Sequence, residues 1–248
     1  MAFVTGPRLL SDIDLYKSTT AIPSGWSVGA KVEGDHGKIF RLVKAGGSAL
    51  VKGNLLQESA EDTTYENMAV GTAGAAGDRY IQVTNGTATI TAEQFKGGTI
   101  GVYTAGTVAV GDEYVITDVT GTLTTGGALK VWVDRPLRYA FTTSAKVNMK
   151  RSPWSGVIQF PASTQTGMPV GVAIYEIPAN EYGWIISHGE CTALSDGSTF
   201  AVGSNVGSVS GTAGCVTVYD AATTLASIGI ARQAAASAKG IAIFLQID

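Results

Sequence analysis

The sequence predicts an all-β protein: one or two small β-barrel or β-sandwich domains, preceded by an extended N-terminal arm and a hairpin. Three observations support this fold class. Short segments alternate apolar and polar residues, as half-buried strands do. Glycine-rich breaks separate them every 10 to 15 residues or so, which is typical of sandwiches and barrels. Glycine contributes 32 of the 248 residues, and few segments carry a helical period.

The first hairpin is predicted from two alternating segments, Val28–Val32 and Lys38–Lys44, which flank a glycine-bounded turn around His36. Residues 1–25 before it lack a clean period and are expected to form the extended arm. Further strands are expected at Thr99–Thr104, Glu113–Val119, Ala128–Asp134, Gly156–Phe160, Val170–Ile177, Gly183–Gly189, Cys215–Asp220 and Gly240–Asp248.

A second hairpin is predicted around Asn85-Gly86, because this dipeptide tolerates the positive φ angles of a tight hairpin turn. Its strands would be Tyr80–Thr84 and Thr87–Thr91. Two segments are ambiguous between helix and strand. Ala92–Gly98 is expected to form at most one helical turn before its glycines. For the alanine-rich stretch 221–240 we expect a strand at Ala226–Arg232 followed by a loop, because a glycine within a helix costs about 1 kcal/mol relative to alanine.

Charge divides the chain into three regions, 1–60, 61–150 and 151–248, which we interpret as arm and hairpin, β domain, and second β domain. The last region holds only three basic and six acidic side chains. We therefore expect part of its surface to be neutral or covered in an assembly. Charged residues make up 15% of the chain, its net charge is -3, and its mean hydropathy is +0.19, a composition that excludes disorder. No apolar run is long enough to span a membrane, and Arg8 and Asp12 interrupt any signal-peptide core.

The chain is poor in the groups that catalysis requires, so we expect no enzyme, cofactor or metal site. Of the two histidines, His36 is explained by its turn, and His188 has serines and Asp196 nearby but no nucleophile-elbow sequence. Cys191 and Cys215 match no zinc or redox spacing. We interpret them as small buried hydrophobes, and a disulfide between them is the alternative.

A basic cluster with interleaved aromatic residues is the strongest candidate binding surface. It comprises Lys130, Arg135, Arg138, Lys146, Lys150 and Arg151. Such a cluster docks on an acidic protein surface or on nucleic acid, or else it forms an ordinary solvated face. We consider nucleic acid unlikely, because the chain's pI is 5.4 and strand alternation is expected to turn Trp132 away from its charged neighbours.

Glycines and apolar strands follow one another in a characteristic order along four blocks of the chain. These blocks are Ser27–Gln57, Gly74–Val119 with Leu129–Leu137, Pro169–Leu194, and Ile228–Ile247. The first contains KAGGSALVKGNL, the second ends in KVWVDRPL, the third reads GVAIYEIPANEYGWIISHG, and the fourth supplies two closing strands. This order, over most of the chain, resembles tailed-bacteriophage virion structural proteins of the capsid decoration, or cement, type.

The resemblance implies a non-enzymatic protein that is made in the host cytoplasm and binds the outer capsid surface in the virion. It would bridge major capsid protein subunits and associate with itself as a dimer or trimer. We expect the contacts to come from Leu9, Leu10, Ile13 and Leu15 of the arm and from Arg135, Arg138, Lys150 and Arg151. Two alternatives stay open: a tail, neck or fibre-base protein of the virion, and a carbohydrate-binding β module that stacks sugars on Trp26, Trp154 or Trp184.

Overall fold

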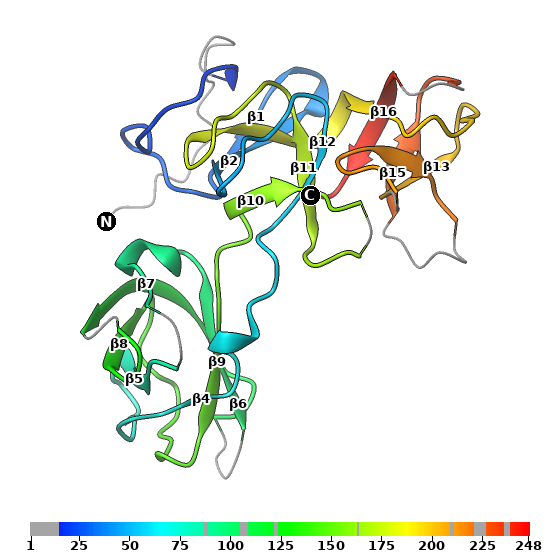
Figure 1. Cartoon of the computed structure of the whole chain (residues 1–248). Coiled ribbons are helices and arrows are strands. Elements are labelled where there is room, and N and C mark those ends of the chain that lie inside the picture. The colour runs from blue at the N-terminus through cyan, green and yellow to red at the C-terminus, as the bar shows by residue number, and fades with distance from the viewer. Residues whose placement is uncertain are drawn as a thin grey trace. The chain divides into compact units, whose positions relative to one another are not determined.

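The computed structural model describes residues 15–86, 89–104, 109–121, 124–162, 164–208, 211–220, 227–235 and 239–248. The fold is all-β, as predicted, with 46% of the residues in strands and 4% in short helices. Two compact units share the chain (Figure 1). Unit 1 combines residues 1–60 with 153–248, and unit 2 is the continuous segment 61–152 between them. No helix within the described ranges is long and apolar enough to cross a membrane.

One part of unit 1 is a closed five-stranded barrel. Its strands, in order around the barrel, are β2 (Ile39–Ala45), β10 (Ser155–Gln159), β3 (Leu55–Gln57), β11 (Pro169–Ala173) and β12 (Tyr182–Leu194). β12 pairs with β2 and closes the ring, in which only the β2–β10 pair is parallel. Small and branched side chains fill the barrel: Val43, Ala45, Leu50, Leu56, Val157, Val170, Ala173, Ile177 and Ile185.

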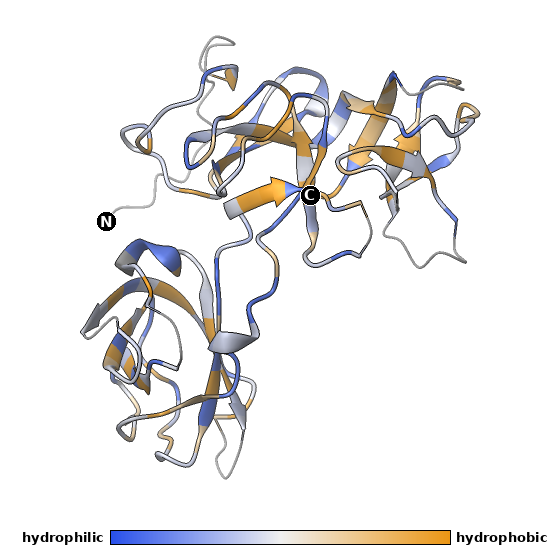
Figure 2. Cartoon of the chain, in the orientation of Figure 1, coloured by the Kyte–Doolittle hydropathy of each residue, from blue (hydrophilic) through white to orange (hydrophobic). Residues whose placement is uncertain are grey.

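In the other part of unit 1, the same sheet continues beyond the barrel. β12 has 13 residues, and its later part pairs with β16 (Gly240–Gln246). The sheet continues through β15 (Ser227–Ala231), β13 (Asn205–Ser208) and β14 (Val216–Val218). A second core, separate from the barrel interior, packs here and includes Phe160, Phe200, Val206, Ile241 and Ile243. Figure 2 shows that β10, β15 and β16 are largely hydrophobic.

The described part of the N-terminal segment is attached to unit 1. Leu15 is 5% exposed and belongs to the second core. Thr19 and Tyr182 exchange two backbone hydrogen bonds of 2.9 and 2.8 Å. The ring of Trp26 packs edge-on against Trp184 with 5.1 Å between centroids. Leu15 and Thr19 thus attach the described part of the expected arm, residues 15–25, to unit 1, whereas Tyr16 and Ile22 stay exposed.

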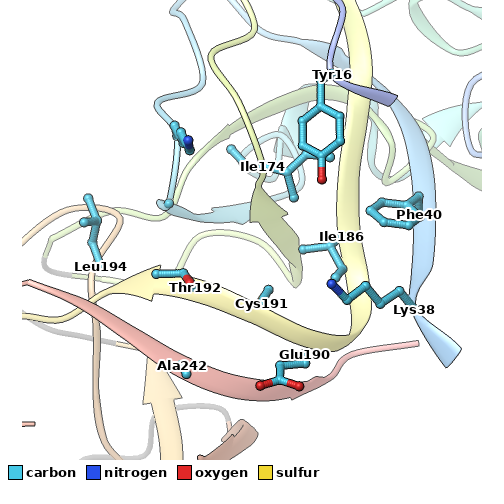
Figure 3. Close-up of a pocket in the computed structure, with 13 residues that line it drawn as sticks. Tyr16, Lys38, Phe40, Ile174, Ile186, Glu190, Cys191, Thr192, Leu194 and Ala242 are labelled. Carbon is cyan, nitrogen blue, oxygen red and sulfur yellow. The ribbon is translucent and has the colours of Figure 1, made fainter. Parts of the chain in front are cut away.

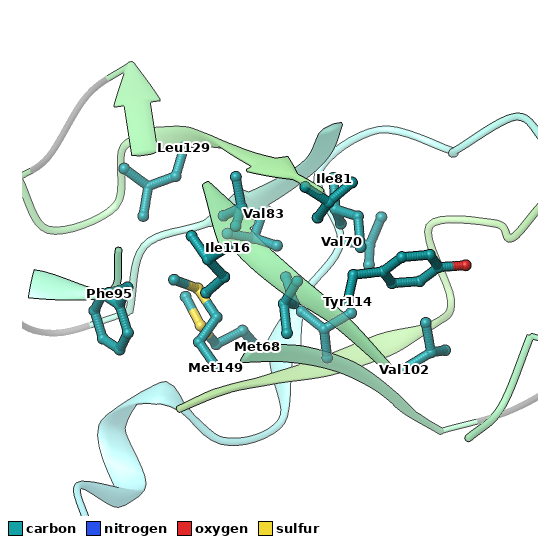
Figure 4. Packing of buried hydrophobic residues seen from close by; sticks show 14 of the residues in the cluster. Met68, Val70, Ile81, Val83, Phe95, Val102, Tyr114, Ile116, Leu129 and Met149 are labelled. Carbon is teal, nitrogen blue, oxygen red and sulfur yellow. The ribbon is translucent and has the colours of Figure 1, made fainter. Parts of the chain in front are cut away.

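Unit 2 is a small antiparallel barrel with its own core. Its sheet order is β4 (Met68–Ala69), β9 (Lys146–Lys150), β6 (Thr99–Thr104), β7 (Glu113–Gly121), β8 (Ala128–Val133) and β5 (Tyr80–Thr84). A bridge between Val70 and Val83 brings β5 back beside β4. Figure 4 shows the side chains inside, among them Met68, Ile116, Leu129 and Met149.

The first predicted hairpin is confirmed. β1 (Lys31–Glu33) pairs antiparallel with β2, and His36 sits in the turn with a φ of 58°. The second is wrong as a pairing, because β5 pairs with β8 rather than with the residues after Asn85. The backbone of Asn85 instead bonds Gly126 and Gly127, where it accepts at 2.9 Å and donates at 2.8 Å. Residues 87 and 88 lie outside the described ranges.

The structure also bears on the two segments that were ambiguous between helix and strand and on the division into domains. Ala92–Gln94 forms one short 3-10 turn, as expected, and β15 confirms a strand within Ala226–Arg232. The described units differ from the three predicted regions. Regions 1–60 and 151–248 were expected to be separate, but they form one barrel, because β2 and β3 of the first region pair with β10, β11 and β12 of the last.

Candidate functional site

The Arg135 guanidinium and the backbone amide of Arg138 both contact one tyrosine, Tyr114, at the start of β7. Tyr114 is 3% exposed, and its hydroxyl accepts from the Arg138 amide at 2.9 Å and donates to the Asp112 carboxylate at 3.1 Å. The Arg135 guanidinium lies 5.1 Å from the Tyr114 ring centroid and donates to the Glu113 carbonyl at 2.5 Å. Burial is the main reason that the pKa of Tyr114 is raised, so its hydroxyl stays protonated near neutral pH.

This arrangement holds the side chain of Arg135 in place and leaves that of Arg138 near the surface. The side chain of Arg135 is held in place by the tyrosine ring and the carbonyl, yet it is 59% exposed. The Arg138 guanidinium lies 5.9 Å from the ring of Tyr139, which is 40% exposed. Arg138 therefore presents a cation beside an exposed aromatic ring, while Arg135 presents an exposed cation that is held by the buried Tyr114.

Lys150 and Arg151 belong to a different part of unit 2. Arg151 lies 3.8 Å from the Asp62 carboxylate and 6.0 Å from the ring centroid of Phe95. Lys150 ends β9 with an exposed side chain. In Figure 4, Phe95 and Tyr114 lie at opposite ends of the core. The structure therefore divides the predicted basic cluster between two ends of the unit, since β9 runs from one end to the other.

The arm residues do not form a described site. Leu9, Leu10 and Ile13 lie outside the described residues. Leu15 was predicted to contact a partner, but it is buried in the core of its own unit. This prediction is corrected, because a side chain that is 5% exposed has almost no surface left for another protein.

Three tryptophans proposed as a sugar platform are packed within unit 1. Trp184 is 3% exposed and Trp26 lies against it. The Arg41 guanidinium lies 5.0 Å from the Trp154 ring centroid. These side chains serve packing, so the sequence-based choice of tryptophans is not supported.

Trp132, on the outer face of unit 2, is the tryptophan with the most exposed surface among the described residues. It is 36% exposed and packs against Tyr80 with 5.3 Å between centroids. The Lys130 ammonium lies 5.0 Å from the Tyr80 ring. The expectation that Trp132 turns away from its charged neighbours is wrong, because residues two apart on a strand share a face. The two-residue spacing of Lys130 and Trp132 is the signal in the sequence that could have revealed this surface. The position of Tyr80 beside Trp132 depends on the pairing register of β5 with β8.

A half-open groove of about 550 Å³ lies on unit 1 (Figure 3). Tyr16, Phe40, Ile174, Ile186 and Leu194 supply its apolar lining. Its polar lining is Lys38, Lys52, Glu190, Cys191 and Thr192. Burial raises the pKa of the Cys191 thiol to about 12, although Lys38 opposes the shift. The thiol is therefore protonated near neutral pH and is a poor nucleophile.

Cys191 is expected to resist alkylation. With a pKa of about 12, its thiolate fraction at pH 8 falls far below that of an ordinary thiol, so iodoacetamide should react at least about 100-fold more slowly than with a free cysteine. Cys215 is buried and its pKa is also raised, and the two cysteines are free thiols. Mass spectrometry of the folded protein, compared with a guanidinium-denatured sample, measures both rates. Rapid labelling of the folded chain at Cys191 would contradict this account.

The serine and histidine of β12 do not form a catalytic pair. Ser187 is buried and donates to Asp248 at 3.1 Å, whereas the imidazole of the next residue, His188, packs edge-on against Phe244. Adjacent residues of a strand point to opposite faces. Within the described ranges, no group of three or more metal-ligating side chains is found.

Comparison of the chain with protein-family models, curated proteins and solved structures finds no match.

Proposed function

We propose that this protein is a non-enzymatic virion structural protein that binds the outer surface of a phage capsid and stabilises it by bridging major capsid protein subunits. The order of segments resembles capsid decoration proteins, as set out above. The observation that carries the proposal is the division of one chain into two β units with separate cores. A bridge requires two binding surfaces, and two units supply them.

Exposed apolar side chains on both units support this role. They include Tyr16, Val51, Met168 and Val202 on unit 1, and Tyr103, Val110, Val115 and Tyr139 on unit 2, each at least 40% exposed. Protein interfaces combine such residues with arginine at their centres. A specific interface buries about 1,200 to 2,000 Å². We propose that these side chains contribute to interfaces with capsid subunits and with further copies of this chain, as a dimer or trimer.

The test is the copy number of this chain in density-purified particles, measured by quantitative mass spectrometry against the major capsid protein. A ratio near one, or a simple fraction of it, is expected for a protein distributed over the shell. A few copies per particle would contradict decoration and favour the alternative position in the tail, neck or fibre base. Absence from particles would contradict both.

Replacing Arg135 and Arg138 together by alanine is expected to weaken capsid association about three- to tenfold at low salt, because it removes two exposed cations. The difference from wild type should shrink above about 0.5 M salt, where the Debye length is only a few ångströms. Co-sedimentation with capsids lacking the protein measures the affinity. Lys96→Ala, which removes an exposed cation of unit 2 outside the predicted contact residues, is the control. Equal loss in the control, or no dependence on salt, would contradict the assignment of these arginines.

A further inference from the structure

Three strands of unit 2 align six side chains in two rows on the outer face of the barrel. In the first row Asp118 of β7 is opposite Trp132 of β8, which is opposite Tyr80 of β5. In the second row Thr120, Lys130 and Gln82 are opposite one another in the same way. Neighbours across strands lie about 5 Å apart and residues two apart on a strand about 7 Å apart. The six side chains therefore cover about 10 by 7 Å, the footprint of one or two sugar rings.

A β-bulge places the acidic member of this patch. The register of β7 with β8 shifts between Ile116, opposite Val133, and Asp118, opposite Trp132. Without the extra residue, Thr117 would lie opposite Trp132, and Asp118 would point toward the core. Bulges often redirect a side chain in this way beside functional sites. Here the bulge places a residue with a carboxylate directly across the strand pair from an exposed tryptophan.

The aromatic rings are held in fixed positions. The indole Nε1 of Trp132 donates to the Thr120 hydroxyl at 3.0 Å, which sets the tilt of the ring. The ring of Tyr80 packs against it at 5.3 Å and 52°, and the Lys130 ammonium lies 5.0 Å from the Tyr80 centroid. A platform that is ordered before binding loses little conformational entropy when a ligand stacks on it.

We infer that this surface, the Trp132 platform, binds a neutral β-linked hexopyranoside. The C–H bonds on one face of such a sugar stack on an aromatic ring, while its equatorial hydroxyls point to the sides. The Asp118 carboxylate accepts the Val119 amide at 2.9 Å with Oδ1, which leaves further lone pairs for sugar hydroxyls. Lys130 and Gln82 supply donors in the second row. The inference concerns unit 2 alone and does not depend on the proposed capsid role.

Two other occupants fit this surface less well. Single-stranded nucleic acid requires a groove with net positive charge, but this patch pairs one cation, Lys130, with one anion, Asp118. A second copy of the chain requires an interface of about 1,000 Å² or more, whereas about 10 by 7 Å is far smaller. A small neutral ligand with a flat apolar face and polar edges matches both the size and the charge.

Titration of the full chain with a neutral β-1,4-linked glucose tetrasaccharide and with lactose tests the inference. Saturation-transfer NMR and tryptophan fluorescence should show saturable binding of at least one of them, with contacts to the sugar C–H groups. Trp132→Ala should weaken this binding at least about tenfold, equivalent to about 1.4 kcal/mol. Asp118→Asn, which preserves the shape of the side chain, should weaken it severalfold.

Controls separate loss of binding from loss of folding. Tyr103→Ala removes another exposed aromatic ring of unit 2, 58% exposed on β6, and should leave the affinity unchanged. Circular dichroism and thermal unfolding verify that each variant is folded. Failure of both sugars to bind wild-type protein, or equal affinity in folded Trp132→Ala or Asp118→Asn protein, would overturn the inference. Tighter binding of an oligothymidine that also depends on Trp132 would assign the platform to nucleic acid instead and equally overturn it.

Discussion

Phe95→Ala is expected to lower the free energy of unfolding of unit 2 by about 3 to 5 kcal/mol. The Phe95 side chain is 1% exposed and packs edge-on against Tyr65 with 4.6 Å between centroids. Its removal would leave a cavity at one end of the core in Figure 4 and would remove the ring beneath the Arg151 guanidinium. A small barrel has few other side chains that can move in to fill the space.

Amide hydrogen exchange locates this effect within the chain. Exchange in β6, β7 and β9 should accelerate in Phe95→Ala protein, while exchange in β12 and β16 stays near wild type. Phe160→Ala is the matched variant for unit 1, because Phe160 is also 1% exposed and belongs to a separate core. It should produce the opposite pattern. Uniform acceleration across both units in either variant would contradict the existence of two separately stabilised cores.

Arg41→Ala is expected to destabilise unit 1 by about 2 to 3 kcal/mol, because one side chain makes several interactions. Its guanidinium donates to both oxygens of Asp248 at 2.6 and 2.8 Å and to the Gly29 carbonyl at 2.9 Å. It also stacks on the ring of Trp154. Only 20% of the Arg41 side chain is exposed, so solvent screens this ion pair less than it would a surface pair.

The same contact predicts a pH dependence. Hydrogen bonding by Arg41 lowers the pKa of Asp248 below its ordinary value, against a smaller opposing effect of burial. The contribution of ionised Asp248 to the stability of unit 1 is therefore complete above the pKa of an aspartate in the unfolded chain, near 3.9. It is lost as the pH falls through the lower pKa of Asp248 in the folded protein. Asp248→Asn should flatten the stability of unit 1 over this acidic range.

Chemical denaturation at a series of pH values measures both effects. Arg232→Ala is the control, because its 4.0 Å contact with Glu190 is exposed and is expected to contribute less than about 0.5 kcal/mol. An Asp248→Asn protein with the same acid sensitivity as wild type would show that other carboxylates govern this range.

Strong alternation made several strands predictable, although β9, with the alternating sequence KVNMK, was missed. β8 follows the sequence ALKVWV with every second residue buried, and β16 follows GIAIFLQ in a similar way. β3 was missed because its three residues, LLQ, are all buried and show no period. β13, with the sequence NVGS, was missed because glycine and serine carry little strand propensity.

Pairings across long sequence separations could not be predicted at all. The parallel contact of β10 with β2 and the closure of the barrel by β12 depend on packing between distant residues. The same limit applies to the candidate sites. Arg135 and Arg138 are close in sequence and both contact Tyr114, Arg138 through its backbone amide, but Arg151 follows β9 to the other end of unit 2. Trp132 gains its partner only through the register with β5.

The ion pair between Asp62 and Arg151 joins the two ends of unit 2, because these residues lie next to the points where its chain enters and leaves unit 1. β3 and β10, which flank the insertion, are neighbours in the barrel. Bringing these strands together across an unfolded connection of that length would carry a large loss of chain entropy. Once unit 2 has folded, the connection behaves as a short loop. We therefore expect unit 2, which is continuous in sequence, to fold first and to accelerate closure of the barrel.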